Sequence, residues 1–210
     1  IRGGEEFFHD LEEEKETNLQ NLIYAPARFL AWSEEKKIEV LAYNEPSLNG
    51  LTLWWQQLFA ESEGKDAKGL FPTSCFYSRD LHSVGQYIQE GTPSLFETFL
   101  NMGKIQSLGN QFERSLRVPS TELSRRLLGN ATGHTISDLN KKIMQATEKA
   151  HASRKIPHCR ITLDKTDEHS FGKLLAFFQV TCMLSATFLE VNPYNQPGVE
   201  AYKSEMRGLL

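Results

Sequence analysis

The sequence has few cysteines, no excess of basic residues and, by inspection, no apolar run approaching the roughly 20 residues that a membrane-spanning helix requires. Its three cysteines, Cys75, Cys159 and Cys182, are odd in number and far apart. That spacing predicts reduced thiols in a cytoplasmic protein rather than a disulfide framework. The net charge of −4 argues against nucleic-acid and membrane-surface partners. The acidic N-terminal stretch IRGGEEFFHDLEEEKE lacks the apolar segment of a signal peptide.

Motifs for nucleotide and metal binding are also missing. No G-x-G-x-x-G or G-x-x-x-x-G-K-[ST] string occurs, so the sequence offers no support for a nucleotide cofactor. The six histidines show no metal-ligand spacing. The nearest grouping, His151 with His158 and Cys159, lacks a paired Cys-x-x-Cys or His-x-x-x-His. We therefore expect neither a metal nor a cofactor.

The 210 residues, of which 40% are hydrophobic and 24% charged, suit one soluble globular domain spanning 1–210. Hydrophobic patterning and turn residues predict alternating strands and helices, with a polar loop or insertion over 103–120. The predicted strands are 36–44, 69–76, 94–102 and 156–164. The predicted helices are 5–33, with a possible break at Pro26, then 47–62, 81–90 capped by Asp80, 121–128, 136–154, 170–191 and a last one beginning at Pro197.

Strands separated by helices of this length imply βαβ units. The predicted fold class is therefore α/β, with a mostly parallel sheet and helices on both faces. In such sheets, ligands bind outside the carboxyl ends of the strands.

One charged residue falls inside a predicted apolar stripe. In the helix beginning at Pro197, Lys203 projects into the arc formed by Val199, Tyr202 and Met206. A lysine there can pack its stem on apolar surface and extend its amine to water. It can also be a partly desolvated amine of lowered pKa, placed to exchange a proton.

Two further residues could take part in proton transfer. Glu61 lies at the edge of the apolar face of the 47–62 helix, and Glu63 does not, so Glu61 is the better candidate for a desolvated general base. His82 falls in the first turn of the helix after Asp80, where the helix N-terminus favours its neutral form. Each residue taken alone is more often an ordinary surface side chain.

The sequence contains NPYNQPGVEAYK (192–203) and three further blocks that resemble one family, the phosphoglucose isomerases, also called glucose-6-phosphate isomerases, in its bacterial, Bacillus-like branch. The C-terminal block NPYNQPGVEAYK (192–203) is similar to the signature of that family. The long block WWQQLFAESEGKDAKGLFPTSCFYSRDLHSVGQYIQEG (54–91) is similar to its central region. Two shorter blocks, NKKIMQATEKAH (140–151) and DEHSFGKLLAFFQVTC (167–182), continue the match in the same order.

The resemblance covers only half of such a protein. Members of the family are about twice as long and contain two sugar-isomerase subdomains, and this chain resembles the C-terminal one with its flanking helices. The resemblance thus implies a three-layer, SIS-like sugar-isomerase fold. The family's Ser/Thr-rich phosphate loop and its Gly-Gly-Arg segment belong to the N-terminal subdomain, and neither string occurs here.

The resemblance also assigns roles to four positions. Glu61 corresponds to the acid/base that moves a proton between C2 and C1 of the sugar through a cis-enediol. His82 and Lys203 correspond to residues that assist ring opening, the histidine being supplied across a dimer interface. Gln196 corresponds to a glutamine that contacts substrate.

The implied function is the C-terminal half of an isomerase that interconverts glucose 6-phosphate and fructose 6-phosphate in glycolysis and gluconeogenesis, without metal or cofactor. The implied partners are a sugar-phosphate substrate, the N-terminal half of the same protein and a second subunit, and the chain alone is expected to be inactive or nearly so. The alternative is a non-catalytic sugar-phosphate-binding or interaction module with the same fold. Tyr194-Asn195, where many members have Phe-Asp, leaves the substrate preference open.

Overall fold

The computed structural model describes residues 1–13, 19–104, 116–165 and 167–209. Four strands form one parallel sheet in the order β2-β1-β3-β4. The strands are β1 (Ile38–Tyr43), β2 (Phe71–Phe76), β3 (Leu95–Lys104) and β4 (His158–Lys165). The α-helices are α1 (Arg2–Glu12), α2 (Leu19–Ser33), α3 (Asn49–Glu63), α4 (Gly85–Glu90), α6 (Glu122–Leu128), α7 (Ile136–Ser153), α8 (Glu168–Phe188) and α9 (Pro197–Leu209). Three short 3₁₀ turns are η2 (Pro46–Leu48), η3 (Asp80–His82) and η4 (Gly129–Ala131).

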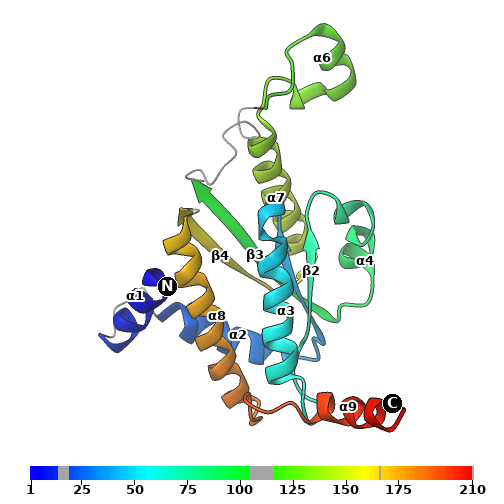
Figure 1. The fold of residues 1–210 in the computed structure, drawn as a ribbon. Helices are drawn as coiled ribbons and strands as arrows, with labels where there is room; N and C mark the ends of the chain where they lie inside the picture. Colours follow the sequence, from blue (N-terminus) through cyan, green and yellow to red (C-terminus); the bar gives the residue numbers. More distant parts are fainter. Residues whose placement is uncertain (14–18, 105–115, 166, 210) are drawn as a thin grey trace.

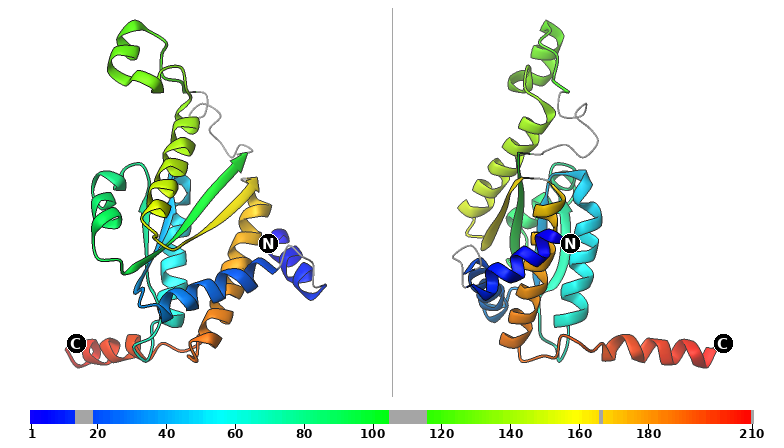
Figure 2. Two further views of the ribbon diagram at one scale, coloured as in Figure 1. Left: turned by 180° about the vertical axis from the view of Figure 1, so that it is seen from behind. Right: turned by 60° about the vertical axis from the view of Figure 1, so that its left-hand side comes forward.

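Helices cover both faces of the sheet, so the predicted α/β class with a parallel sheet is confirmed (Figures 1 and 2). Along β3, Phe96 and Leu100 enter a core shared with α2, α3 and α8. Leu95 and Phe99 enter a second core with residues of α4 and α7. This alternation follows from the period of two along a strand. It explains why the strands of a sheet covered on both sides are apolar in nearly every position.

The predicted elements are largely confirmed, with two corrections. The long helix expected over 5–33 is wrong: α1 ends at Glu12 and α2 begins at Leu19, and Pro26 lies inside α2 without ending it. Asp80 does not cap a regular helix. Its carboxylate accepts a hydrogen bond from Phe76 N (2.7 Å) and pairs with Arg79, and a 3₁₀ turn precedes α4. Most of the loop expected over 103–120 lies outside the described residues.

Helix α8 corrects the expectation that no apolar segment reaches membrane-spanning length. Its 21 residues are long and apolar enough, by length and composition, to cross a membrane. In this fold it packs against α1, α2 and α3, and nine of its residues are buried. Its composition is therefore that of a core helix.

A buried arginine joins four elements at the centre of the α2–α3–α8 layer. Arg28 of α2 donates from Nε to Glu39 Oε2 on β1 (2.7 Å) and from Nη1 to Glu63 Oε1 in the last turn of α3 (2.6 Å). Nη1 also donates to Ser185 Oγ on α8 (2.9 Å). The guanidinium lies 3.9 Å from the centre of the Phe59 ring. One side chain thus fixes the relative positions of α2, β1, α3 and α8.

The charge balance of this cluster has a consequence for Glu63. Burial by itself would lower the pKa of the Arg28 guanidinium, but the carboxylates of Glu39 and Glu63 outweigh it and hold the pKa of Arg28 above its usual value. Tyr24 and Thr98 also donate to Glu39, at 2.6 and 2.7 Å. Burial raises the pKa of Glu63, against the charge of Arg28, because one guanidinium fully compensates only one carboxylate.

Replacing Arg28 should destabilise the fold strongly. In Arg28→Met, Glu39 and Glu63 lose their buried cation, and we expect the free energy of unfolding to fall by about 3–5 kcal/mol. Arg126→Met removes an exposed arginine from α6 and should change it by no more than about 0.5 kcal/mol. Urea denaturation followed by circular dichroism measures both. Equal stabilities of the two variants would contradict a central role for the cluster.

Candidate active site

The predicted base, Glu61, lies in the last turn of α3 and is half-buried. Gln57, one helical turn earlier, donates from Nε2 to Glu61 Oε1 at 3.3 Å. Gln196, just before α9, donates from Nε2 to Glu61 Oε2 at 3.0 Å. Both carboxylate oxygens are therefore oriented by amide donors. The structure thus brings together two of the predicted site residues, Glu61 and Gln196, which are 135 positions apart in the chain.

Two lysines fasten the segment before α9 to the end of α3. Lys65 donates from Nζ to the carbonyl oxygens of Ser62 and Asn192. Lys68 donates from Nζ to the carbonyl oxygen of Leu189 at 2.8 Å. Burial lowers the pKa of Lys65. These bonds tie the loop after α3 to the residues after α8, and so they hold Gln196 near Glu61.

Lys203 lies near the same end of the molecule but is not desolvated. Its ammonium donates to Glu200 Oε1 at 2.9 Å on the exposed surface of α9. The hydrogen bond and charge of Glu200, with a smaller contribution from the charge of Glu61, raise the pKa of Lys203. The interpretation of Lys203 as a partly desolvated amine of lowered pKa is therefore wrong for this chain, because its pKa is raised and no residue of α9 is buried.

The apolar stripe predicted for α9 is formed by the helix but covered by nothing in the described residues. Tyr202 and Met206 are each 56% exposed, and Leu209 is 87% exposed. Figures 1 and 2 show α9 projecting away from the body of the domain beyond the end of α8. Lys203 is thus positioned on a helix whose apolar face has no packing partner in this chain.

His82 lies at the carboxyl ends of the strands, whereas Glu61 lies at their amino ends. It ends the 3₁₀ turn Asp80–His82 that follows β2, and it is exposed. Glu61 precedes β2, at the amino ends of the strands. Because a six-residue strand is roughly 20 Å long, the two side chains of one chain cannot act on the same sugar carbons.

The sequence pattern of α3 predicted the wrong carboxylate to be the more buried of the two. Glu63 is the buried one, at 1% exposure, and it is bound to Arg28, whereas Glu61 keeps access to solvent. The apolar stripe of α3 predicts the face turned toward the sheet, and it gives no sign of a buried arginine from another helix. Glu63 is therefore a structural residue and is not available as a base.

Gln57 is a site residue that the sequence analysis did not single out. Its spacing of four from Glu61 places both side chains on one face of α3. The sequence spacing alone could therefore have predicted that Gln57 lies beside Glu61.

Glu61 and Gln196 lie at the amino ends of the strands, so the expectation of a ligand at the carboxyl ends does not describe this pair. Among the described residues, no group of three or more His, Cys, Asp or Glu side chains could hold a metal ion.

Removing the carboxylate of Glu200 should lower the pKa of Lys203. In Glu200→Gln the ammonium loses its hydrogen-bonded anion, which is the largest cause of the raised pKa. Reductive ¹³C-methylation of the lysines and NMR titration measure the change. Glu205→Gln, on the same exposed helix, is the control and should leave the Lys203 titration unchanged. A pKa of Lys203 unaffected by Glu200→Gln would contradict the pairing.

Comparison with known proteins gives consistent matches to one family. No family model matches the chain. The chain is 43% identical over 211 residues to a glucose-6-phosphate isomerase of Onion yellows phytoplasma, a match that covers all of this chain and 48% of the relative. It is 40% identical over 210 residues to that of Acholeplasma laidlawii, with the same coverage. It is 43% identical over 187 residues to that of Clostridioides difficile, covering 89% of this chain and 40% of the relative.

Solved structures agree in fold. A hypothetical protein from Thermus thermophilus superposes on 98% of this chain with a TM-score of 0.80, at 20% identity and over 48% of its own length. A glucose-6-phosphate isomerase from Chlamydia trachomatis superposes on 99% of this chain with a TM-score of 0.71, at 16% identity and over 41% of its length. The resemblance predicted from the sequence blocks is confirmed, and the chain spans about half the length of the curated relatives it matches.

Proposed function

Since the chain aligns along its whole length with the C-terminal half of glucose-6-phosphate isomerases, we propose that it supplies the proton-transfer residues of such an isomerase. The substrate would be a sugar phosphate, converted between its aldose and ketose forms. The observation that carries the proposal is the solvent access and the orientation of the Glu61 carboxylate. Its carboxylate is reachable from solvent and each of its oxygens is oriented by an amide, from Gln57 and Gln196.

The chemistry assigned to Glu61 is transfer of one proton between neighbouring carbons. The carboxylate removes the proton from C2 of the open-chain aldose while the oxygen at C1 takes up a proton from solvent, giving a cis-enediol. The carboxylic acid then returns its proton to C1 as the hydroxyl at C2 loses one to solvent, giving the ketose. A general base contributes on the order of 10²–10⁴-fold to such a step. Amide donors on both oxygens fix the direction of the carboxylate. Orientation of this kind is itself part of catalysis.

Lys203 and His82 are assigned to ring opening. As an ammonium of raised pKa, Lys203 carries a proton at neutral pH and can give it to the ring oxygen. Its place on an uncovered helix implies that the site is completed by other parts of a longer protein. We propose the N-terminal half of the same protein, which would also bind the phosphate, as that partner. For this reason we expect the chain alone to have little or no turnover.

A second subunit is the proposed source of the histidine. Within one chain, His82 lies across the length of β2 from Glu61, but both are exposed enough to meet at an interface. A closed two-fold dimer would bring His82 of each chain to Glu61 of the other at two equivalent sites. We propose that the intact protein is such a dimer and acts in the cytoplasm.

The base is tested by Glu61→Gln in a full-length chimaera. The chain replaces the matching half of the Acholeplasma laidlawii isomerase, to which it is 40% identical, and conversion of glucose 6-phosphate to fructose 6-phosphate is measured in a coupled assay. Glu61→Gln should lower kcat by about 10²–10⁴-fold, because the amide cannot accept the C2 proton. Glu34→Gln, an exposed residue after α2, is the control and should be neutral.

Two results would contradict the assignment. Full activity of the Glu61→Gln chimaera would place the base elsewhere. A folded chimaera that binds glucose 6-phosphate but does not turn it over, even with Glu61 present, would favour the non-catalytic binding module. Incorporation of solvent deuterium at C2 of the recovered glucose 6-phosphate follows the proton transfer separately from the overall conversion to fructose 6-phosphate.

Sharing of the site between subunits is tested by mixing inactive chimaeras. Glu61→Gln and His82→Gln are each expected to be inactive as homodimers. When the two are unfolded and refolded together, one of the two sites in every heterodimer has both native residues, so activity should reappear. Mixtures of either variant with itself are the controls. Absence of recovery, with heterodimers demonstrated by mass spectrometry, would show that His82 does not act across the interface.

A further inference from the structure

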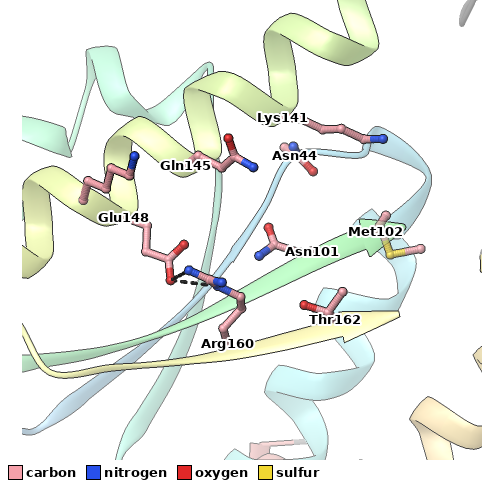
Figure 3. A pocket seen from close by; sticks show the side chains of 9 residues that line it. Asn44, Asn101, Met102, Lys141, Gln145, Glu148, Arg160 and Thr162 are labelled. Carbon is pink, nitrogen blue, oxygen red and sulfur yellow. Dashed lines mark hydrogen bonds and ion pairs between the residues drawn. The ribbon is translucent and has the colours of Figure 1, made fainter. Parts of the chain in front are cut away.

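A second concave site lies at the carboxyl ends of the strands, on the face covered by α7. Its cavity has a volume of about 510 Å³ and is lined by the end of β1, by β3, by β4 and by one side of α7. Figure 3 shows the side chains of Asn44, Asn101 and Gln145 pointing into the space between α7 and the strands. Glu61 and Gln196 lie at the other edge of the sheet, so this cavity is separate from the candidate active site.

The topology explains why a cavity forms at this place. From β1 the chain passes to β2 on one side, and from β2 it crosses back over β1 to β3 on the other side. The chain therefore leaves β1 towards one side of the sheet and leaves the neighbouring strand β3 towards the other side, where β4 lies. The gap between β1 and β3 is the topological switch point of the sheet. In open parallel sheets, a crevice forms there outside the carboxyl ends of the strands.

The strand register lines this crevice with polar side chains. Asn101 on β3 is the register partner of Thr162 on β4. Phe99, two residues before Asn101, is paired with Ala42, two residues before Asn44. Asn44, Asn101 and Thr162 thus lie at the same level of three neighbouring strands. Together they offer two amides and one hydroxyl.

The cavity has an excess of positive charge in an acidic chain. Lys141 and Lys149 of α7 and Arg160 of β4 line it, against one carboxylate, Glu148. Glu148 is already occupied: Arg160 donates to its Oε1 from Nε (2.9 Å) and Nη2 (2.7 Å). The two lysines make no ion pair with any residue in the part of the chain that the structure describes. The chain as a whole carries a net charge of −4.

Asn44 places an amide inside the cavity. The residue is 4% exposed, and its side chain lines the cavity and points into the space between α7 and the strands (Figure 3). Its amide is not among the buried side-chain groups that lack a hydrogen-bond partner in the described part of the chain. An amide both donates and accepts hydrogen bonds, so it suits the hydroxyl and phosphate oxygens of a ligand.

From these observations we infer that the cavity is a binding site for a small phosphorylated polyol. The two lysines match a phosphate dianion, and the amides and Thr162 match hydroxyl groups. Eight of the nine lining side chains carry polar groups, and Met102 is the exception, so a ligand with charge and hydroxyl groups finds partners around the cavity. The volume falls in the range of small-molecule sites. This site is additional to the proposed isomerase chemistry and does not depend on it.

The four methionines allow the site to be located by NMR. With ¹³C-methyl methionine in the full chain, Met102 reports on the cavity, while Met206 on α9 reports on the region of Lys203. We expect glycerol 3-phosphate to shift the Met102 signal saturably and to leave Met206 unchanged. Neutral glycerol should shift neither, and added salt should weaken binding because the attraction is ionic.

Matched variants identify the charges and the amide. Lys141→Leu should weaken glycerol 3-phosphate binding by about tenfold, as should Asn44→Ala, because each removes a donor to a charged or hydroxyl oxygen. Lys142→Leu, its neighbour on α7 whose amine lies near His134 outside the cavity, should bind like the original chain. Glu61→Gln should also bind normally.

Three results would overturn the inference. They are no saturable shift of Met102, equal binding by the Lys141→Leu and Lys142→Leu chains, or a shift confined to Met206. If inorganic phosphate bound as tightly as glycerol 3-phosphate, the site would recognise the anion alone and the polyol assignment would be wrong. Isothermal titration calorimetry of the same chains gives the affinities.

Discussion

The buried guanidinium of Arg28 is the interaction on which the positions of the other parts depend. It binds carboxylates on β1 and at the end of α3 and a hydroxyl on α8, inside the layer that covers one face of the sheet. Glu63, one of its partners, is two residues after Glu61. The anchored end of α3 and the tied segment after α8 meet at the same edge of the sheet. The candidate base therefore lies where the contacts of Arg28, Lys65 and Lys68 hold several elements together.

The two ends of the parallel strands carry different kinds of candidate site. At the amino ends of the strands, Glu61 lies on an open surface, oriented by amides from two separate elements. At the carboxyl ends, a basic and amide-rich cavity lies under α7. The open surface near Glu61 and the uncovered α9 fit a site shared with other chain segments. The cavity under α7 is lined by this chain's own elements.

The exposure of helix α9 is consistent with a chain that spans only about half the length of its relatives. Its apolar side chains are exposed, and the lysine that it carries is a solvated ammonium held by Glu200. An apolar helix face exposed to water is unfavourable, and burying it against another body would also desolvate Lys203. Under the proposed function, the same contact would complete both the packing of α9 and the ring-opening site.

The sequence by itself determined most of the local structure, since periods of two and 3.6 residues and turn residues such as Pro197 act over short distances. It also determined the resemblance to glucose-6-phosphate isomerases, through blocks such as NPYNQPGVEAYK. Only the tertiary structure decided which carboxylate of α3 is buried, because Glu63 is bound by Arg28, which lies 35 positions away in the chain. Likewise, the pairing of Gln196 with Glu61, the solvation of Lys203 and the cavity at Asn44 depend on contacts between distant segments. No periodicity within one segment encodes such contacts.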